Sequence, residues 1–187
     1  MVQDKIIKEI KENLRMITEK QKETDQEIAS LSKELKNVGE MVGKMTDGWG
    51  RVVEGLVVSS VPVIFKRLGI DVFYQTLRSK RYKDGKELEI DILCLGKDRD
   101  GEEMAIISEV KSDVSSKDID EFLADLDQFK YFFDEYRDKR AIGVIAGMRF
   151  GKGAQRYAEK CGLYVLGPSG EVMELLTKPD FKPKIWR

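Results

Sequence analysis

Residues 87–111 read ELEIDILCLGKDRDGEEMAIISEVK. Two apolar runs flank the turn sequence Asp-Arg-Asp-Gly, a pattern that indicates two antiparallel strands joined by a hairpin. A three-residue loop over 99–101 would place its glycine in the left-handed conformation that glycine adopts readily. Because this loop is centred on residue 100, the numbers of opposed residues sum to 200. The register therefore predicts that Asp91 lies opposite Glu109.

Three charged side chains lie within the apolar parts of these two strands, residues 90–96 and 104–111. Asp91 is in the first strand. Glu109 and Lys111 share a face of the second strand, since side chains alternate with a period of two. Opposed residues have Cβ atoms about 4.5–5.5 Å apart, and two carboxylates at that distance repel each other unless a divalent cation lies between them. The pattern predicts a cation site, which a register shift of one residue would destroy.

Asp91 and the triplet Glu109-Val110-Lys111 resemble the signature of the PD-(D/E)XK nuclease superfamily, an Asp on one hairpin strand and (Asp/Glu)-x-Lys on the next. The resemblance implies a Mg²⁺- or Mn²⁺-dependent hydrolase, an endonuclease that cuts DNA to give a 5′-phosphate and a 3′-hydroxyl, with RNA as an open alternative. It implies that Asp91, Glu109 and the Val110 carbonyl bind the metal. Lys111 would orient or help deprotonate the attacking water. Glu54, on the preceding helix, would be a further catalytic residue that reaches the metal through water.

Two positions depart from the superfamily's patterns. Ile90, not Pro, precedes Asp91. Gln128 is implied as a further catalytic residue because its surroundings resemble the Gln-hydrophobic-x-x-Tyr motif of RecB-like nucleases. Phe132 occupies the Tyr position of that motif, however, and Tyr131 comes one residue early. Gln128 is thus the weakest of the implied site residues.

Residues 48–187 are predicted to form one α/β domain. Apolar periodicity indicates the order α-β-β-β-α-β-α-β. Gly69 is expected to end the first helix, Ser115 and Asp118 to cap the second, and residues 83–86 to form a turn. The first six elements resemble the restriction-endonuclease-like core, a mixed central sheet flanked by helices. The expected helices are 51–68, 115–137 and 152–161, and the expected strands are 70–79, 87–95, 103–111, 141–147 and 163–166.

Residues 1–47 are predicted to form a long coiled-coil helix that precedes this domain. Apolar residues recur with spacings of 3 and 4 over about six heptads, which keeps one stripe of a supercoiled helix facing its partner. One layer, Gln21 and Thr24, is polar, and self-association as a dimer, trimer or tetramer stays open. The alternative is a helix folded back on its own domain. The two seam series are Ile7, Leu14, Gln21, Ile28, Leu35, Val42 and Ile10, Ile17, Thr24, Leu31, Val38, Met45.

Composition excludes several classes of protein. The chain of 187 residues has a net charge of −1, so any anionic partner must bind a local patch. It contains no His, which excludes Ser-His-Asp and Cys-His nucleophile systems and His-ligated zinc. Cys94 and Cys161 lie in apolar runs and are expected to be free thiols in a reducing cytoplasm. The charged N-terminus, and the absence of an apolar run of about 20 residues, predict a cytoplasmic protein with no membrane partner.

Two clusters of basic residues are candidates for a nucleic-acid surface. The first surrounds the turn of the first hairpin and includes a Tyr that could stack on a base or ribose. The second follows the fourth strand. The alternative for both is ordinary solvated surface. The candidate residues are Arg78, Lys80, Arg81, Tyr82, Lys83 and Lys86 in the first cluster, and Arg149, Lys152 and Arg156 in the second.

Three functions stay open on the sequence alone. The first is a DNA endonuclease whose active sites are brought together by the coiled coil. The second is a catalytically inactive protein on a nuclease fold that binds nucleic acid or serves as a scaffold. The third is a coiled-coil assembly protein in which Lys111 pairs with Glu89 or Glu109, backbone donors satisfy Asp91, and Glu54 is a solvated helix residue.

Overall fold

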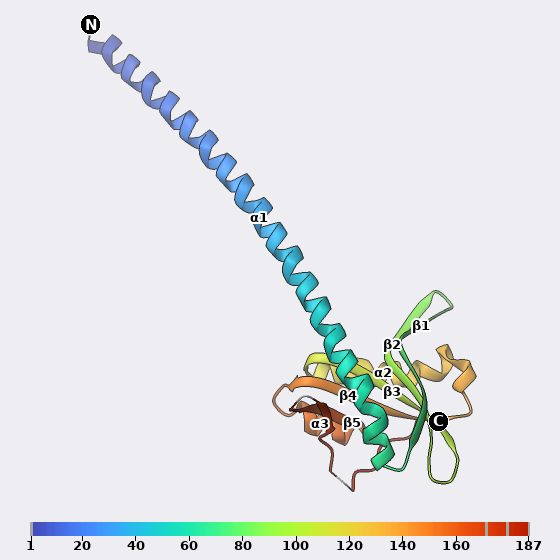
Figure 1. The fold of residues 1–187 in the computed structure, drawn as a ribbon. Coiled ribbons are helices and arrows are strands. Elements are labelled where there is room, and N and C mark those ends of the chain that lie inside the picture. The colour runs from blue at the N-terminus through green and yellow to red at the C-terminus, as the bar shows by residue number, and fades with distance from the viewer. Residues whose placement is uncertain (1, 171, 179, 187) are drawn as a thin grey trace. The chain divides into compact units, whose positions relative to one another are not determined.

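The computed structural model divides into two units, Met1–Asp47 and Gly48–Arg187. Helix α1, Val2–Arg67, contributes residues to both units (Figure 1). The structure describes residues 2–170, 172–178 and 180–186, and it describes their side chains at 11–38 and from 48 onwards.

The first unit is helical, as the heptad pattern predicts. All side chains between 11 and 38 are exposed, including the apolar residues of the predicted seam. Ile7, Ile10, Val42 and Met45 of that seam lie outside the described side chains. The exposed seam residues are Leu14, Ile17, Ile28, Leu31, Leu35 and Val38, each 55% to 71% exposed. These residues form an exposed apolar stripe on an otherwise charged helix, at the spacing that the heptad pattern predicts.

The second unit is built on a six-stranded mixed sheet in the order β1-β2-β3-β4-β5-β6 (Figure 1). β1, β2 and β3 are antiparallel neighbours, β3, β4 and β5 are parallel, and β6 is antiparallel to β5. The order of elements is the predicted one, with β6 as an additional strand. The strands are β1 Asp71–Lys83, β2 Lys86–Lys97, β3 Glu103–Val114, β4 Arg140–Phe150, β5 Tyr164–Ser169 and β6 Val172–Leu175. The helices after α1 are α2 Ser116–Phe132, a 3-10 helix Asp134–Tyr136 and α3 Ala154–Lys160.

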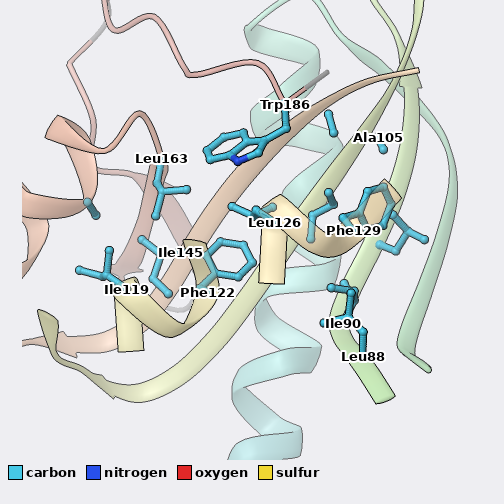
Figure 2. Packing of buried hydrophobic residues seen from close by; sticks show 14 of the residues in the cluster. Leu88, Ile90, Ala105, Ile119, Phe122, Leu126, Phe129, Ile145, Leu163 and Trp186 are labelled. Atoms are coloured by element: carbon cyan, nitrogen blue, oxygen red, sulfur yellow. The ribbon is translucent and has the colours of Figure 1, made fainter. Parts of the chain in front are cut away.

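Apolar side chains form a core layer on each face of the sheet. Figure 2 shows the layer under α2, where Phe122 and Phe129 pack with strand residues such as Ile145. The end of α1 covers the other face, where Val57 belongs to the same cluster as Ile106 of β3. The central strands β2, β3 and β4 are therefore buried between helices over much of their length, and a charged side chain on their buried faces needs a partner.

The segment Gly48–Arg67 of α1 corrects one expectation. An 18-residue window of this 20-residue segment has a mean hydropathy of 1.3, so the chain does contain a stretch with the length and composition of a membrane span. Val53, Val57, Val61 and Phe65 of this segment are at most 1% exposed. They pack on the sheet, which is the arrangement of a core helix in a folded domain.

Local sequence signals set the helix ends and the turns. Ser115 and Asp118 form the predicted capping box, in which each side chain accepts a hydrogen bond from the other's backbone N–H. Gly69 follows the end of α1 with a φ of +86°, a conformation that favours glycine. Asp84 and Gly85 join β1 and β2, both with left-handed backbone, as a two-residue hairpin requires.

Several elements differ from their predicted bounds. β1 continues to Lys83 because the residues after 79 still pair with β2. α2 ends at Phe132, where the next residue leaves the helical conformation and a 3-10 helix follows. Cys94 and Cys161 are free thiols, as predicted.

Phe129 tests the packing of the layer under α2. It is fully buried, with its ring centre 5.0 Å from that of Phe133 and 6.0 Å from that of Tyr136. We predict that Phe129→Ala lowers the free energy of unfolding by about 3–5 kcal/mol, because it leaves a cavity. Tyr82→Ala, which truncates a ring that is 72% exposed, is the control and should cost less than about 1 kcal/mol. Urea unfolding measures both, and equal losses would contradict the packing.

Candidate functional site

The register between β2 and β3 is the predicted one. Paired positions sum to 200 along the whole ladder, which ends at Ile92 and Ser108. Gly101 in the connecting loop has the expected left-handed φ, +81°. Asp91 and Glu109 are the next pair in this register. They therefore lie at the point where the two strands stop pairing.

Asp91 lies at an irregularity of β2. Ile90 and Leu93 both pack in the layer under α2, while Ile92 packs toward α1, so the regular alternation of side chains breaks here. The Asp91 carboxylate accepts a hydrogen bond of 2.9 Å from the backbone N–H of Val110. A side chain of β2 therefore accepts a backbone hydrogen bond from β3, and this bond holds Asp91 beside Glu109.

Glu109 and Lys111 project from β3 on the face that α2 covers, in phase with Ile107. They form an ion pair, with 2.6 Å between Lys111 Nζ and Glu109 Oε1. The Glu109 side chain is 15% exposed and that of Lys111 is 40% exposed. The carboxylate is therefore largely removed from water, while the ammonium group stays accessible.

Burial and neighbouring negative charges raise the pKa values of both acids. Burial is the larger cause at Asp91, and the hydrogen bond from Val110 and the charge of Lys111 oppose it in part. At Glu109, burial and then the negative charge of Asp91 raise the pKa to about 7, against the ion pair with Lys111. The charge of Lys111 therefore does not balance the two carboxylates of the site. A divalent cation between them would favour the ionised form of both.

Lys111 is charged in this structure. Burial lowers the pKa of Lys111, but its hydrogen bond to Glu109 and the negative charges of Glu109, Asp91 and Asp118 raise it more, so the net direction is upward. Lys111 is therefore a cation and a hydrogen-bond donor at neutral pH. Of the two roles expected for it, this favours orientation of a water molecule over removal of its proton.

Glu54 is bound to Arg78 and is not a solvated helix residue. The guanidinium contacts both carboxylate oxygens, with Nη2 at 2.7 Å from Oε1 and Nε at 3.0 Å from Oε2. The Glu54 side chain is only 13% exposed. Its negative charge also contributes to the raised pKa of Asp91. Glu54 therefore acts on Asp91 through its charge, while Arg78 takes both of its carboxylate oxygens.

Arg78 has a φ of +50° inside β1. Positions 77 and 79 pair regularly with positions 92 and 90 of β2, which places Arg78 opposite Asp91 in the register. A left-handed backbone costs a residue with a Cβ about 1–2 kcal/mol. The strain of β1 thus falls opposite the irregularity of β2.

The donor set for a metal ion consists of oxygen atoms. Within the described ranges, no three His, Cys, Asp or Glu side chains converge as metal ligands. Asp91, Glu109 and the Val110 carbonyl are hard donors that fit Mg²⁺ or Mn²⁺. The repulsion that raises the pKa of Glu109 is what such an ion would relieve. Mg²⁺ commonly uses few protein ligands and completes its shell with water and substrate phosphate.

The structure gives no support to Gln128 as a site residue. It is exposed on α2, and its amide donates to the Ala124 carbonyl of its own helix at 3.4 Å. α2 instead brings Asp125 near the site, where its negative charge adds to the raised pKa of Glu109. Sequence analysis missed Asp125, because its approach to Glu109 depends on how α2 packs on the sheet and not on a local motif.

Most cations of the first basic cluster are paired within the protein. The pairs are Arg78–Glu54, Lys80–Glu87, Lys80–Glu89, Arg81–Glu135 and Lys83–Asp134. Tyr82 and Lys86 are exposed. In the second cluster Arg149 pairs with Asp113, whereas Lys152 and Arg156 are exposed and have no ion pair in the described part of the chain. Both clusters are at the surface, but they offer fewer available cations than their composition suggests.

No protein-family model matches the sequence, and no curated protein is significantly similar to it. Solved structures with partial similarity include a repair endonuclease from Pyrococcus abyssi (21% identity, TM-score 0.37), EndoMS in apo form (22%, 0.35) and the EndoMS-dsDNA2 complex (22%, 0.33). The matches cover 60%, 60% and 62% of this chain, and 45%, 46% and 45% of those chains. The chain thus spans under half the length of these structures, and the TM-scores are too low to transfer a function.

The raised pKa of Glu109 predicts the pH response of the metal-free protein. A carboxyl with a higher pKa in the folded state than in the unfolded state favours folding while protonated, so stability falls as pH rises from about 4.5 to about 7. Glu109→Gln mimics the neutral form and should be more stable than wild type at pH 8, by up to about 3 kcal/mol, with a smaller gain at pH 5.

Urea unfolding with a chelator present, at both pH values, measures this difference. Glu87→Gln is the control, because the pKa of Glu87 is lowered by its bonds to Lys80 and Tyr82, and this variant should gain no stability. A gain for Glu109→Gln that does not change with pH would contradict the explanation.

Proposed function

We propose that residues 48–187 form a Mg²⁺- or Mn²⁺-dependent endonuclease domain with a PD-(D/E)XK, restriction-endonuclease-like core, and that it hydrolyses phosphodiester bonds in DNA. The observation that carries the proposal is the convergence of Asp91 and Glu109 at the end of the β2–β3 ladder, with Lys111 bonded to Glu109. Two largely buried carboxylates close to each other are costly for a fold, and they are expected where a protein binds a cation.

Each residue has a role in hydrolysis. Asp91, Glu109 and the Val110 carbonyl would hold the metal ion, which when bound polarises a phosphate oxygen and lowers the pKa of water. The hydrogen bond from Val110 keeps Asp91 in place. Lys111 would orient the attacking water and offset the negative charge that grows on the phosphate. The water oxygen bonds to phosphorus and loses a proton, while the bond from phosphorus to the 3′-oxygen breaks and that oxygen takes up a proton.

Exposed groups near the surface support nucleic acid as the partner. Lys86, Lys152 and Arg156 are exposed cations that can contact phosphate groups. The highly exposed ring of Tyr82 can stack on a base. We propose DNA as the substrate, and RNA is the alternative that the assay distinguishes. Glu54 is a further candidate for the metal site, through a water molecule.

We further propose that the helix over 1–47 associates with other copies of itself in a coiled coil of two to four chains. Six apolar seam residues between 11 and 38 are exposed at coiled-coil spacing. A second copy presents the same stripe with the same spacing and charged flanks, so it can cover this face along its length. Association would bring two or more nuclease domains together, and cutting both strands of a duplex requires two hydrolysis events.

Cleavage of DNA tests the proposed function. Wild-type protein with Mg²⁺ or Mn²⁺ should cut at least one of linear, supercoiled, single-stranded or branched DNA, and a chelator should abolish cleavage. Lys111→Ala and Asp91→Asn should lower the rate by about 10²-fold or more, because each removes a group that acts in the transition state. Lys117→Ala, at a position 84% exposed on α2, is the control and should leave the rate unchanged.

Two results would overturn this assignment. Equal cleavage by wild type and Lys111→Ala would place the activity elsewhere. No cleavage of any DNA or RNA with either metal would favour an inactive nuclease-fold protein that binds nucleic acid or serves as a scaffold.

Self-association is tested on the seam. We predict that Ile28→Lys combined with Leu31→Lys shifts the oligomeric state toward a monomer, because burying charged side chains between helices is costly. Met16→Lys is the matched control, since Met16 is 54% exposed on the same helix but lies off the seam. Sedimentation equilibrium measures the mass of each protein. A wild-type monomer, or an unchanged mass for the double variant, would contradict the proposal.

A further inference from the structure

Arg78 combines three features that the proposed reaction does not explain. Its backbone is left-handed within β1. It lies opposite Asp91 in the register, and its guanidinium takes both carboxylate oxygens of Glu54. The Arg78 side chain is nevertheless 48% exposed. A surface ion pair contributes little to stability, so stability alone does not account for a strained backbone at this position.

Arg78 is a cation among acidic residues in the metal-free protein. It is bonded to Glu54, and the negative charges of Asp91 and Glu89 also act on it. Two cations at one site repel each other, so this guanidinium disfavours a divalent ion at Asp91. While Arg78 holds both oxygens of Glu54, that carboxylate is not available to the site.

A phosphodiester is a suitable competitor for Arg78. A guanidinium binds phosphate oxygens with the same pair of donors that it offers to a carboxylate. The exposed part of the side chain is accessible to a bound strand. Transfer of Arg78 to a phosphate would free Glu54 and would move a positive charge away from the metal site.

We propose that Arg78 is a positioning residue that couples the binding of the metal ion to the binding of nucleic acid. Without nucleic acid, it holds Glu54 and disfavours the metal. With nucleic acid bound, it contacts a phosphate and leaves Glu54 to the metal site. Each ligand then strengthens the binding of the other by the same factor. This inference rests on the proposed nuclease function.

Calorimetric titration with Mg²⁺, with and without a short DNA duplex, measures the coupling. Every protein carries Lys111→Ala, so that the DNA stays intact. DNA should raise the Mg²⁺ affinity of this reference protein about fivefold or more. Arg78→Asn removes the charge and tolerates a left-handed backbone. The Arg78→Asn variant should bind Mg²⁺ about three- to tenfold more tightly than the reference protein without DNA. Addition of DNA should then raise its Mg²⁺ affinity only slightly.

Three further variants separate the coupling from effects on folding. Arg140→Asn is the matched control, because the Arg140 guanidinium bonds to Asp98 and Arg140 pairs with Met104, at the other end of β3, and it should keep both the metal affinity and the coupling. Arg78→Lys keeps the charge and should keep the weaker metal binding without DNA. Glu54→Gln should lower the Mg²⁺ affinity only when DNA is present. If the Arg78–Glu54 ion pair served only the fold, the variants would change the unfolding curve but would not change these Mg²⁺ affinities.

The outcomes separate this inference from the proposed function. If folded Arg78→Asn binds Mg²⁺ like the reference protein in both conditions, the coupling by Arg78 is wrong and the nuclease assignment stands. If DNA does not change the Mg²⁺ affinity of the reference protein, the coupling is also wrong. If neither the reference protein nor the wild type binds Mg²⁺ at all, the nuclease proposal itself fails.

Discussion

The pairing register of β2 and β3 is the constraint on which the candidate site depends. It is set by the short loop around Gly101 and by apolar packing on both faces of the sheet, with Ile107 toward α2 and Ile106 toward α1. A slip of one residue would bury the wrong side chains and would send Asp91 and Glu109 to opposite faces. The packing that stabilises the sheet therefore also holds two carboxylates together against their repulsion.

The balance of charge in the site bears on the third function that the sequence leaves open, an assembly protein with structural carboxylates. Lys111 balances Glu109, and Arg78 balances Glu54, whereas Asp91 has one backbone N–H as its hydrogen-bond partner in the described part of the chain. Buried acids that serve only the fold are usually fully paired, because unpaired charge is costly in a low-dielectric interior. The remaining negative charge favours a site that binds a cation over an assembly protein with structural carboxylates.

The features that the sequence predicted depend on short-range rules. Turn residues set both hairpins, and the loop centred on residue 100 placed Asp91 and Glu109 in one register, so the centre of the candidate site was predictable. β6 was not, because it has only four residues and pairs with β5 alone. The Arg78–Glu54 pair and the approach of Asp125 depend on how α1 and α2 pack on the sheet. Residue spacing within one strand or helix does not encode that packing.

The site lies where regular structure stops. The β2–β3 ladder ends, the alternation of β2 breaks at Asp91, and β1 adopts a left-handed residue at the opposed position, Arg78. The irregularity at Asp91 and the left-handed backbone of Arg78 lie opposite each other, so they form one distortion that crosses β1 and β2. A continuous ladder would pair the backbone groups of β3 with β2, and the Val110 N–H would not be available to hold Asp91. The local cost of about 1–2 kcal/mol at Arg78 is therefore tied to the polar groups that the site exposes, as expected where function, and not stability, determines a local conformation.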